Sequence, residues 1–273
     1  MYLAYWGLSL LPFENTPNPK FLYQSAQHEE ALARLMYVVE ARKGAAVLTG
    51  VFGCGKTLIA QSLLSRLPDN RYRTVYLANP LLSGVELLHT IAHRLHVPNL
   101  PERRSEVLTN ILLESIEQAL KENMRDGKDT VIIIDEAHVI HEEPVIEQLR
   151  LLLNFQQQDR FLLTLILMGQ PELKELVDRH KPLAQRIAMG YHLGAFSLQE
   201  TADYIHHRLA VAGASRPDAV FSQKAVELMF QYSGGIPRRI NQLGDLAMVA
   251  GMGKGVKQID ESVLQDAAGS LGV

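Results

Sequence analysis

Two short stretches of the sequence combine the residue types that phosphate chemistry needs. The first reads Gly-Val-Phe-Gly-Cys-Gly-Lys-Thr from Gly50 to Thr57, with the spacing G-x-x-x-x-G-K-T. Glycines let backbone N–H groups close around phosphate oxygens, and a helix that begins after the loop adds the positive end of its dipole. We therefore predict that this stretch binds a nucleotide; the alternative is a chance turn of glycine and lysine.

The residues expected to bind the nucleotide through this loop are Gly50, Val51, Phe52, Gly53, Cys54, Gly55, Lys56, Thr57 and Leu58. Lys56 is expected to neutralise the β- and γ-phosphates. Thr57 is expected to give its hydroxyl to Mg²⁺, because this ion prefers hard oxygen ligands.

Asp135 and Glu136 form the second stretch, directly after the apolar run Val131 to Ile134. This pattern is typical of a buried strand that delivers carboxylates to the carboxyl edge of a parallel sheet. We predict that Asp135 holds Mg²⁺ through water and that Glu136 polarises the attacking water. The alternative is a strand that happens to end in an acidic turn.

Two other nucleotide-dependent classes fit the sequence less well. Asp135 to His138 spells the DEAH motif of a helicase class, but that class needs two motor domains, and the 273 residues contain one phosphate loop. A GTPase needs an Asn-Lys-x-Asp motif to bind the base, and the sequence has none. ATP is therefore the predicted nucleotide.

Alternating strand and helix patterns predict a parallel α/β core that positions both stretches. The predicted strands are 45–49, 74–78, 130–134, 162–168 and 191–194, and the predicted helices between them are 56–67, 84–95, 105–125 and 144–156, with a short one after Pro171. Beyond Phe196 only helical patterns follow, at 198–212, 222–232, 236–250 and from 260, with caps at Ser197 and Ser222. We expect an arm at 1–25, a core at 26–195 and a small helical domain at 196–273.

Smaller signals complete this prediction. The prolines of residues 1–25 favour an irregular arm, and Gly251, Gly253 and Gly255 indicate a loop. His89, His93 and His96 have helical spacing, but no further ligand completes a metal site, so we interpret them as one helix face. We interpret His138 and His141 as structural.

Composition places the chain among ordinary globular proteins. Hydrophobic residues make up 47% and charged residues 21%, with a net charge of -3. The start lacks the basic leader of a signal peptide, and no apolar run approaches the length of a membrane helix. With Cys54 as its single cysteine, the chain cannot form an internal disulfide. We expect a cytoplasmic protein without direct membrane insertion, peripheral to the inner membrane only through partners.

The pattern resembles the AAA+ superfamily of P-loop ATPases, and more closely the ATPases similar to general secretion pathway protein A and to the MshM protein of pilus biogenesis. The residues that carry the resemblance are Tyr5-Trp-Gly-Leu-Ser, Pro12-Phe13, Thr16-Pro-Asn-Pro19, Tyr23, His28-Glu-Glu-Ala-Leu32, the two stretches above, Gly169-Gln170-Pro171-Glu172-Leu173, Gln185-Arg186-Ile187 and Gly235-Ile-Pro-Arg238. The resemblance covers nearly the whole chain and implies a five-stranded core with a helical lid.

The resemblance also implies roles for three polar residues. Gln170 is similar to sensor 1, which contacts the γ-phosphate or the water, although a turn residue before Pro171 is the alternative. Arg186 is similar to the arginine finger that one subunit supplies to the next, with Arg179 as the fallback. Arg238 is similar to sensor 2 on the lid, and the alternative is a helix-terminal arginine paired with an acid.

By the same resemblance the arm contributes to an adenine and ribose pocket, with Tyr23, His28 and Phe13 as candidates, although Phe13 fits a core position better. The family implies a homo-oligomer, as a hexamer or a helical filament, that uses Mg-ATP to assemble or remodel a secretion or pilus machine of the bacterial envelope. An alternative resembles TnsC, which forms filaments on duplex DNA; Arg103 and Arg104 are the basic candidates for it. A scaffold that does not turn over ATP is disfavoured by Glu136.

Overall fold

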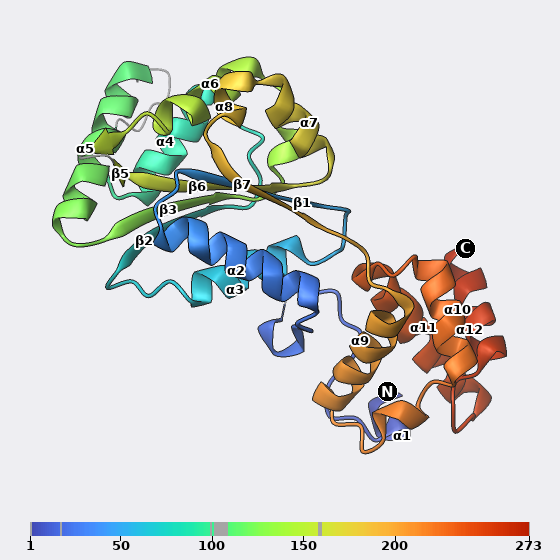
Figure 1. The fold of residues 1–273 in the computed structure, drawn as a ribbon. Coiled ribbons are helices and arrows are strands. Elements are labelled where there is room, and N and C mark those ends of the chain that lie inside the picture. The colour runs from blue at the N-terminus through green and yellow to red at the C-terminus, as the bar shows by residue number, and fades with distance from the viewer. Residues whose placement is uncertain (1, 17, 99, 101–108, 158–159, 273) are drawn as a thin grey trace. The chain divides into compact units, whose positions relative to one another are not determined.

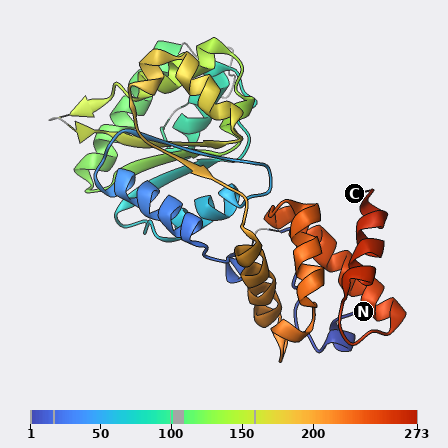
Figure 2. The same ribbon diagram turned by 45° about the vertical axis from the view of Figure 1, so that its right-hand side comes forward.

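The computed structural model describes residues 2–16, 18–98, 100, 109–157 and 160–272. The chain forms two compact units. The helical unit consists of Met1–Gln27, Val51–Leu58 and Gly194–Val273, and the sheet unit consists of His28–Gly50 and Ile59–Leu193. Figures 1 and 2 show both units.

A five-stranded parallel sheet forms the centre of the sheet unit (Figure 1). Its strands, in spatial order, are β2 (Tyr72–Leu77), β3 (Asp129–Ile134), β6 (Leu163–Gly169), β1 (Ala45–Gly50) and β7 (Ile187–Leu193). Every neighbouring pair runs parallel, so all five carboxyl ends lie at one edge of the sheet. The predicted five-stranded parallel α/β core is confirmed.

Helices cover both faces of this sheet, as its nearly continuous apolar strands require. On one face lie α2 (Ala26–Glu40) and α3 (Lys56–Ser65); on the other lie α4 (Gly84–Arg94), α5 (Thr109–Arg125), α6 (Glu143–Leu152), α7 (Glu172–Arg179) and α8 (Lys181–Ala184) (Figures 1 and 2). Residues 105–108, predicted to begin the helix at 105–125, lie outside the described residues. The central strands β1 and β6 are buried along their whole length.

The edge of the sheet departs from the prediction. β7 begins at Ile187, earlier than the predicted strand at 191–194. Only one face of β7 is shielded and its residues alternate in exposure, so its first residues do not form a continuous apolar run. The short strands β4 (Gln156–Gln157) and β5 (Arg160–Phe161) pair antiparallel and were not predicted. Two residues each give too little pattern to indicate a strand.

Four helices build most of the helical unit. They are α9 (Leu198–Val211), α10 (Gln223–Ser233), α11 (Pro237–Lys254) and α12 (Glu261–Leu271). The side chain of Ser197 accepts from the backbone N–H of Glu200, 3.2 Å away, and Ser222 caps α10 in the same way. Both predicted caps are confirmed, and they fix where α9 and α10 begin.

Two predictions for this unit are wrong. The arm is not wholly irregular, because it contains the helix α1 (Tyr2–Trp6) and the 3-10 turn η1 (Pro19–Phe21). The predicted glycine loop is also wrong, because α11 continues through Gly251 and Gly253 to Lys254, and Gly255 caps it with a φ of +68°.

The packing of the arm on α11 accounts for both of these differences. The indole Nε1 of Trp6 donates to the carbonyl of Met248, 3.0 Å away, so the arm packs on α11. A Cβ on Gly251 would lie 2.9 Å from the Trp6 ring. The glycine is thus a close-packing position within a helix and not a break in it.

Within the described part of the chain, no helix is long and apolar enough to cross a membrane.

Candidate functional site

The phosphate loop has the predicted context of a strand, a loop and a helix. β1 ends at Gly50 and α3 begins at Lys56, so the loop runs directly into a helix N-terminus. Gly53 and Gly55 have φ values of +84° and +107°, in the region that favours glycine. The spacing of the glycines therefore reflects a backbone that other residues would adopt only with strain.

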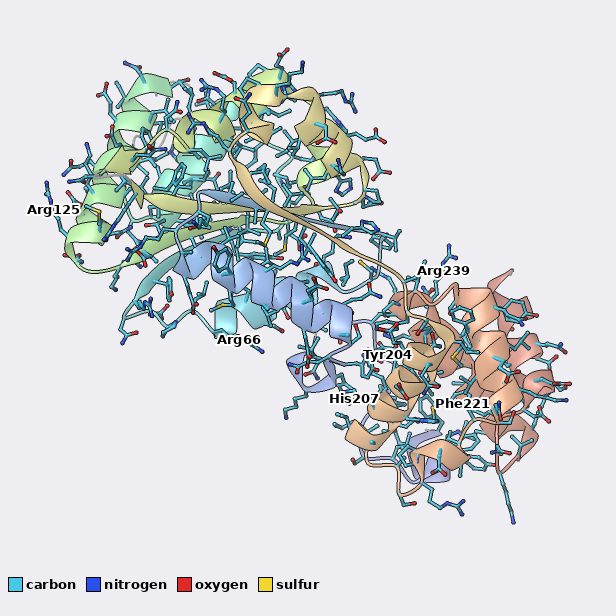
Figure 3. The ribbon with its side chains drawn as sticks, in the orientation of Figure 1. Arg66, Arg125, Tyr204, His207, Phe221 and Arg239 are labelled. Carbon is cyan, nitrogen blue, oxygen red and sulfur yellow. The ribbon has the colours of Figure 1, made fainter. Side chains whose placement is uncertain are left out.

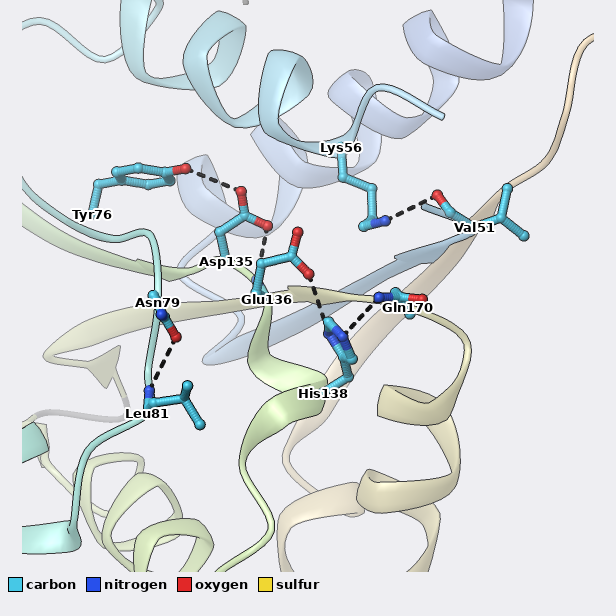
Figure 4. Close-up of polar contacts among 9 residues, drawn as sticks. All are labelled: Val51, Lys56, Tyr76, Asn79, Leu81, Asp135, Glu136, His138 and Gln170. Atoms are coloured by element: carbon cyan, nitrogen blue, oxygen red, sulfur yellow. Dashed lines mark hydrogen bonds and ion pairs between the residues drawn. The ribbon is translucent and has the colours of Figure 1, made fainter. Parts of the chain in front are cut away.

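Lys56 lies against this loop. Its Nζ donates to the carbonyl oxygen of Val51, 3.1 Å away, and the residue is 5% exposed (Figure 4). Cys54 is also buried, whereas Phe52 is 54% exposed. Thr57 and Leu58 follow Lys56 in the first turn of α3, where backbone N–H groups and the helix dipole favour an anion.

Arg238 lies beside the same loop within the helical unit. Its backbone N–H donates to the carbonyl of Gly53, 3.3 Å away, and its guanidinium carbon lies 4.6 Å from the centroid of the Phe52 ring. A Cβ on Gly53 would come within 2.6 Å of the Arg238 Cβ. The structure thus brings the predicted sensor 2 residue to the phosphate loop, with its charged group stacked on Phe52.

The acid pair follows β3 in the sheet unit. Asp135 is 2% exposed, and one of its carboxylate oxygens accepts from the hydroxyl of Tyr76, 3.0 Å away. The other accepts from the backbone N–H of Glu136, 2.9 Å away (Figure 4). Burial, together with the negative charge of Asp135, raises the pKa of the Tyr76 phenol, so the hydroxyl stays protonated and donates.

Tyr76 is a site residue that the sequence analysis missed. It lies one residue before the end of β2, and β2 is the neighbour of β3 in the sheet. A polar side chain near the carboxyl end of a predicted strand was the available signal. Without the strand order, however, that signal does not say which strand the side chain faces.

Glu136, His138 and Gln170 form a polar chain within the sheet unit (Figure 4). Glu136 has a φ of +54° and precedes the 3-10 turn η3 (Ala137–Val139). A carboxylate oxygen of Glu136 lies 3.4 Å from His138 Nδ1, and His138 Nε2 lies 2.9 Å from the amide nitrogen of Gln170. The predicted base and the predicted sensor 1 residue are thus connected through one histidine.

The two arginine finger candidates lie elsewhere in the sheet unit. Arg186 donates to the carbonyl of Leu153, 2.9 Å away, and lines an open pocket of about 590 Å³ with Lys43 and Arg150. Arg179 is exposed on α7. Neither arginine is part of the polar chain formed by Glu136, His138 and Gln170.

The predicted adenine-pocket residues belong to two different units of the chain. Phe13 is 2% exposed and packs edge-on against Phe221, which makes it a core residue of the helical unit. Tyr23 packs on Tyr204 and His207 of α9, both labelled in Figure 3. His28 is buried in α2 of the sheet unit.

Arg103 and Arg104, the basic candidates for DNA binding, lie outside the described residues. Arg66 and Arg125 are exposed at separate positions in the sheet unit (Figure 3). Among the residues that the structure describes, no three His, Cys, Asp or Glu side chains are arranged to hold a metal ion by themselves.

Comparison with known proteins assigns the fold and the motifs to a family. The profile of the AAA domain matches residues 39–177, a segment that contains both the phosphate loop and the acid pair. The chain belongs to the AAA family. Membership of this family makes it an ATP-hydrolysing P-loop enzyme.

This AAA protein is 39% identical over 262 residues to general secretion pathway protein A of Aeromonas hydrophila. The match covers 95% of the chain and 46% of the relative, so the chain spans about half of that protein's length. The predicted resemblance to this group of AAA+ ATPases is confirmed.

Solved structures share the fold at low sequence identity. The Aeropyrum pernix ORC2 protein, in complexes with ADPNP and ADP, matches with a TM-score of 0.68 and 16% identity over 94% of this chain and 71% of that one. Drosophila ORC bound to DNA matches with a TM-score of 0.68 and 15% identity over 96% of this chain and 64% of that one. Both likenesses establish the architecture alone.

Proposed function

We propose that the chain is a Mg²⁺-dependent ATPase whose turnover drives assembly or remodelling of a bacterial secretion or pilus machine. The observation that carries this proposal is the 39% identity to general secretion pathway protein A over 95% of the chain. The two ORC structures are 15% and 16% identical, which supports a common fold and leaves function open.

The phosphate loop and the acid pair are the proposed Mg-ATP site. β1 and β3 are parallel members of one sheet, so the loop after Gly50 and the acids after Ile134 both begin at its carboxyl edge. Backbone N–H groups of the loop, with Lys56, hold the phosphates. Thr57 would hold Mg²⁺ through its hydroxyl and Asp135 would hold it through water; this ion commonly takes few protein ligands because phosphates and waters supply the rest.

These residues divide the chemical work of hydrolysis. Mg²⁺ held by these residues would supply neutralisation of charge on the phosphates. Glu136 accepts a proton from the attacking water, and Gln170 orients polar groups beside it. Arg186 acts on the nucleotide of a neighbouring copy, and Arg238 links nucleotide state to the helical lid.

Arg186 has this role only if copies of the chain associate, so the proposal includes a nucleotide-dependent homo-oligomer, as a hexamer or a helical filament. It also keeps the division into an arm at 1–25 with Tyr23, a core at 26–195 with His28, and a lid at 196–273, in which the arm and core contribute to the adenine pocket. We place this oligomer in the cytoplasm, where an envelope protein recruits it to the membrane.

A second candidate function is ATP-dependent assembly on duplex DNA. It is worth testing because one ORC structure that shares this fold was solved bound to DNA. DNA binding through phosphates would weaken steeply with salt, because each neutralised phosphate releases counterions.

Light scattering after size exclusion separates the two candidates. The wild type and Glu136→Gln are run with ATP or ADP, with and without duplex DNA, at low and moderate salt. The secretion proposal predicts that ATP alone drives a defined oligomer and that DNA changes neither its mass nor the ATPase rate. If salt-sensitive filaments form only when DNA is present, the second candidate replaces the secretion proposal.

A further inference from the structure

The polar chain of Glu136, His138 and Gln170 is linked by an incomplete contact. His138 Nε2 has a hydrogen-bond partner in Gln170, whereas His138 Nδ1 is buried and makes no hydrogen bond in the structure. The Glu136 carboxylate lies 3.4 Å from Nδ1, beyond the usual range for a charge-assisted hydrogen bond.

The donors and acceptors of these three side chains determine which nitrogen of His138 carries the proton. The amide nitrogen of Gln170 can only donate, so Nε2 of the neutral His138 ring accepts and Nδ1 carries the proton. That N–H faces the Glu136 carboxylate, which accepts. The reversed amide would place the proton on Nε2 and leave a bare nitrogen against a carboxylate, so we assign the first arrangement.

The backbone on both sides is shaped around the His138 ring. A Cβ on Gly169 would lie 3.0 Å from the backbone nitrogen of His138 and 3.1 Å from its Nδ1, so glycine leaves the ring its space. Glu136 is held in the left-handed region, with a φ of +54°, where a non-glycine residue is strained. Strain of this kind is maintained only when surrounding contacts fix the residue.

We propose that His138 is a positioning residue that couples Gln170 to Glu136, an inference that rests on the proposed function. Gln170 holds Nε2, and the resulting Nδ1–H orients the Glu136 carboxylate for the water. Loss of the His138 ring leaves the loop residues that bind ATP unchanged, but the Glu136 carboxylate is no longer held in place. Substitution of His138 should therefore lower kcat and leave the affinity for ATP unchanged.

Kinetics of five variants test this coupling. His138→Ala removes both contacts, and His138→Asn keeps a donor close to the position of Nδ1. His141→Ala is the matched control, since this histidine is exposed three residues further along the chain. Glu136→Gln is measured alone and with His138→Ala added. Steady-state phosphate release gives kcat, and titration with a fluorescent ATP analogue gives Kd.

We expect His138→Ala to lower kcat about 10-fold to 100-fold, the cost of a misplaced catalytic group, with Kd within about twofold of wild type. His138→Asn should recover much of the loss, and His141→Ala should match wild type. In the Glu136→Gln background, His138→Ala should change the residual rate by less than about twofold, because no base remains to be positioned.

Two results would overturn the coupling while the ATPase function stands: an unchanged kcat in His138→Ala, or an equal loss with and without the Glu136 carboxylate. If wild type and His141→Ala both failed to release phosphate, the proposed function itself would be overturned, and the coupling with it.

Discussion

Both oxygens of the Asp135 carboxylate accept hydrogen bonds from the protein, one from Tyr76 and one from the backbone of Glu136. A carboxylate fixed in this way is already oriented before an ion binds. Groups that hydrogen-bond to a metal-binding side chain commonly control the affinity of the site for the metal. At the scale of the residue, the proposed Mg²⁺ site therefore depends on a tyrosine from the neighbouring strand.

Tyr76→Phe removes the hydroxyl and leaves the ring. We expect the Mg²⁺ concentration for half-maximal ATPase activity to rise about 10-fold, since loss of an outer partner costs this much in metal affinity. The measurement is the ATPase rate at saturating ATP over a Mg²⁺ titration. Tyr72→Phe, on the same strand but far from its carboxyl end, should behave as wild type; equal Mg²⁺ dependence in the two variants would contradict the role of Tyr76.

Residues within one motif could be predicted from the sequence, and their outer partners could not. The loop from Gly50 to Thr57 and the pair Asp135 and Glu136 are recognised by local spacing and a preceding apolar run. Tyr76 and His138 act through contacts that depend on strand order and on a left-handed turn. No spacing rule encodes these contacts.

At the scale of elements, the arm and α11 explain the main errors in the predicted fold. Gly244 and Gly251 are seven residues apart, so they lie on one face of α11. A Cβ on Gly244 would lie 2.9 Å from the Phe13 ring, much as one on Gly251 would meet Trp6. Most strand and helix positions could be predicted from apolar periodicity. The glycines near the end of α11 indicated a loop, whereas Gly251 is a position where the helix packs closely against the arm.

Two glycine substitutions in α11 distinguish the effect of close packing against the arm from the effect of helix propensity. Gly244→Ala should destabilise the fold by about 1–3 kcal/mol through overpacking against Phe13. Gly253→Ala meets nothing within 4 Å and should stabilise it by about 0.5–1 kcal/mol, because alanine favours a helix interior. Urea unfolding measures both free energies, and a neutral Gly244→Ala would contradict the docking of the arm.

The helical unit also carries a predicted pH dependence at His207 of α9. Burial, and then the charge of Arg208, lower the pKa of His207 below its ordinary value of 6.5. The unfolded chain therefore binds this proton more readily, and stability should fall as the pH drops through 6.5 and level off below the folded-state pKa.

Urea unfolding near pH 7.5 and near pH 5.5 checks this dependence. The loss of unfolding free energy at the lower pH should be smaller in His207→Gln than in wild type. An identical loss in the two proteins would rule out His207 as a source of the pH dependence.

At the scale of the whole molecule, the phosphate loop belongs to one unit and the strand before it to the other. Val51–Leu58 groups with the helical unit, whereas β1 and the acid pair belong to the sheet unit. The sequence could predict the family and the nucleotide, since both are carried by motifs. Oligomer size and partner depend on surfaces that act only between molecules, so no local pattern encodes them.

The most direct test of the account is steady-state phosphate release from Mg-ATP by wild type, Glu136→Gln and Glu142→Gln. We predict turnover in wild type and in Glu142→Gln, whose exposed acid lies outside the proposed site. Glu136→Gln should lose at least about 100-fold in rate while still binding ATP. Equal turnover in all three proteins would contradict the claim that Glu136 is the base of this ATPase.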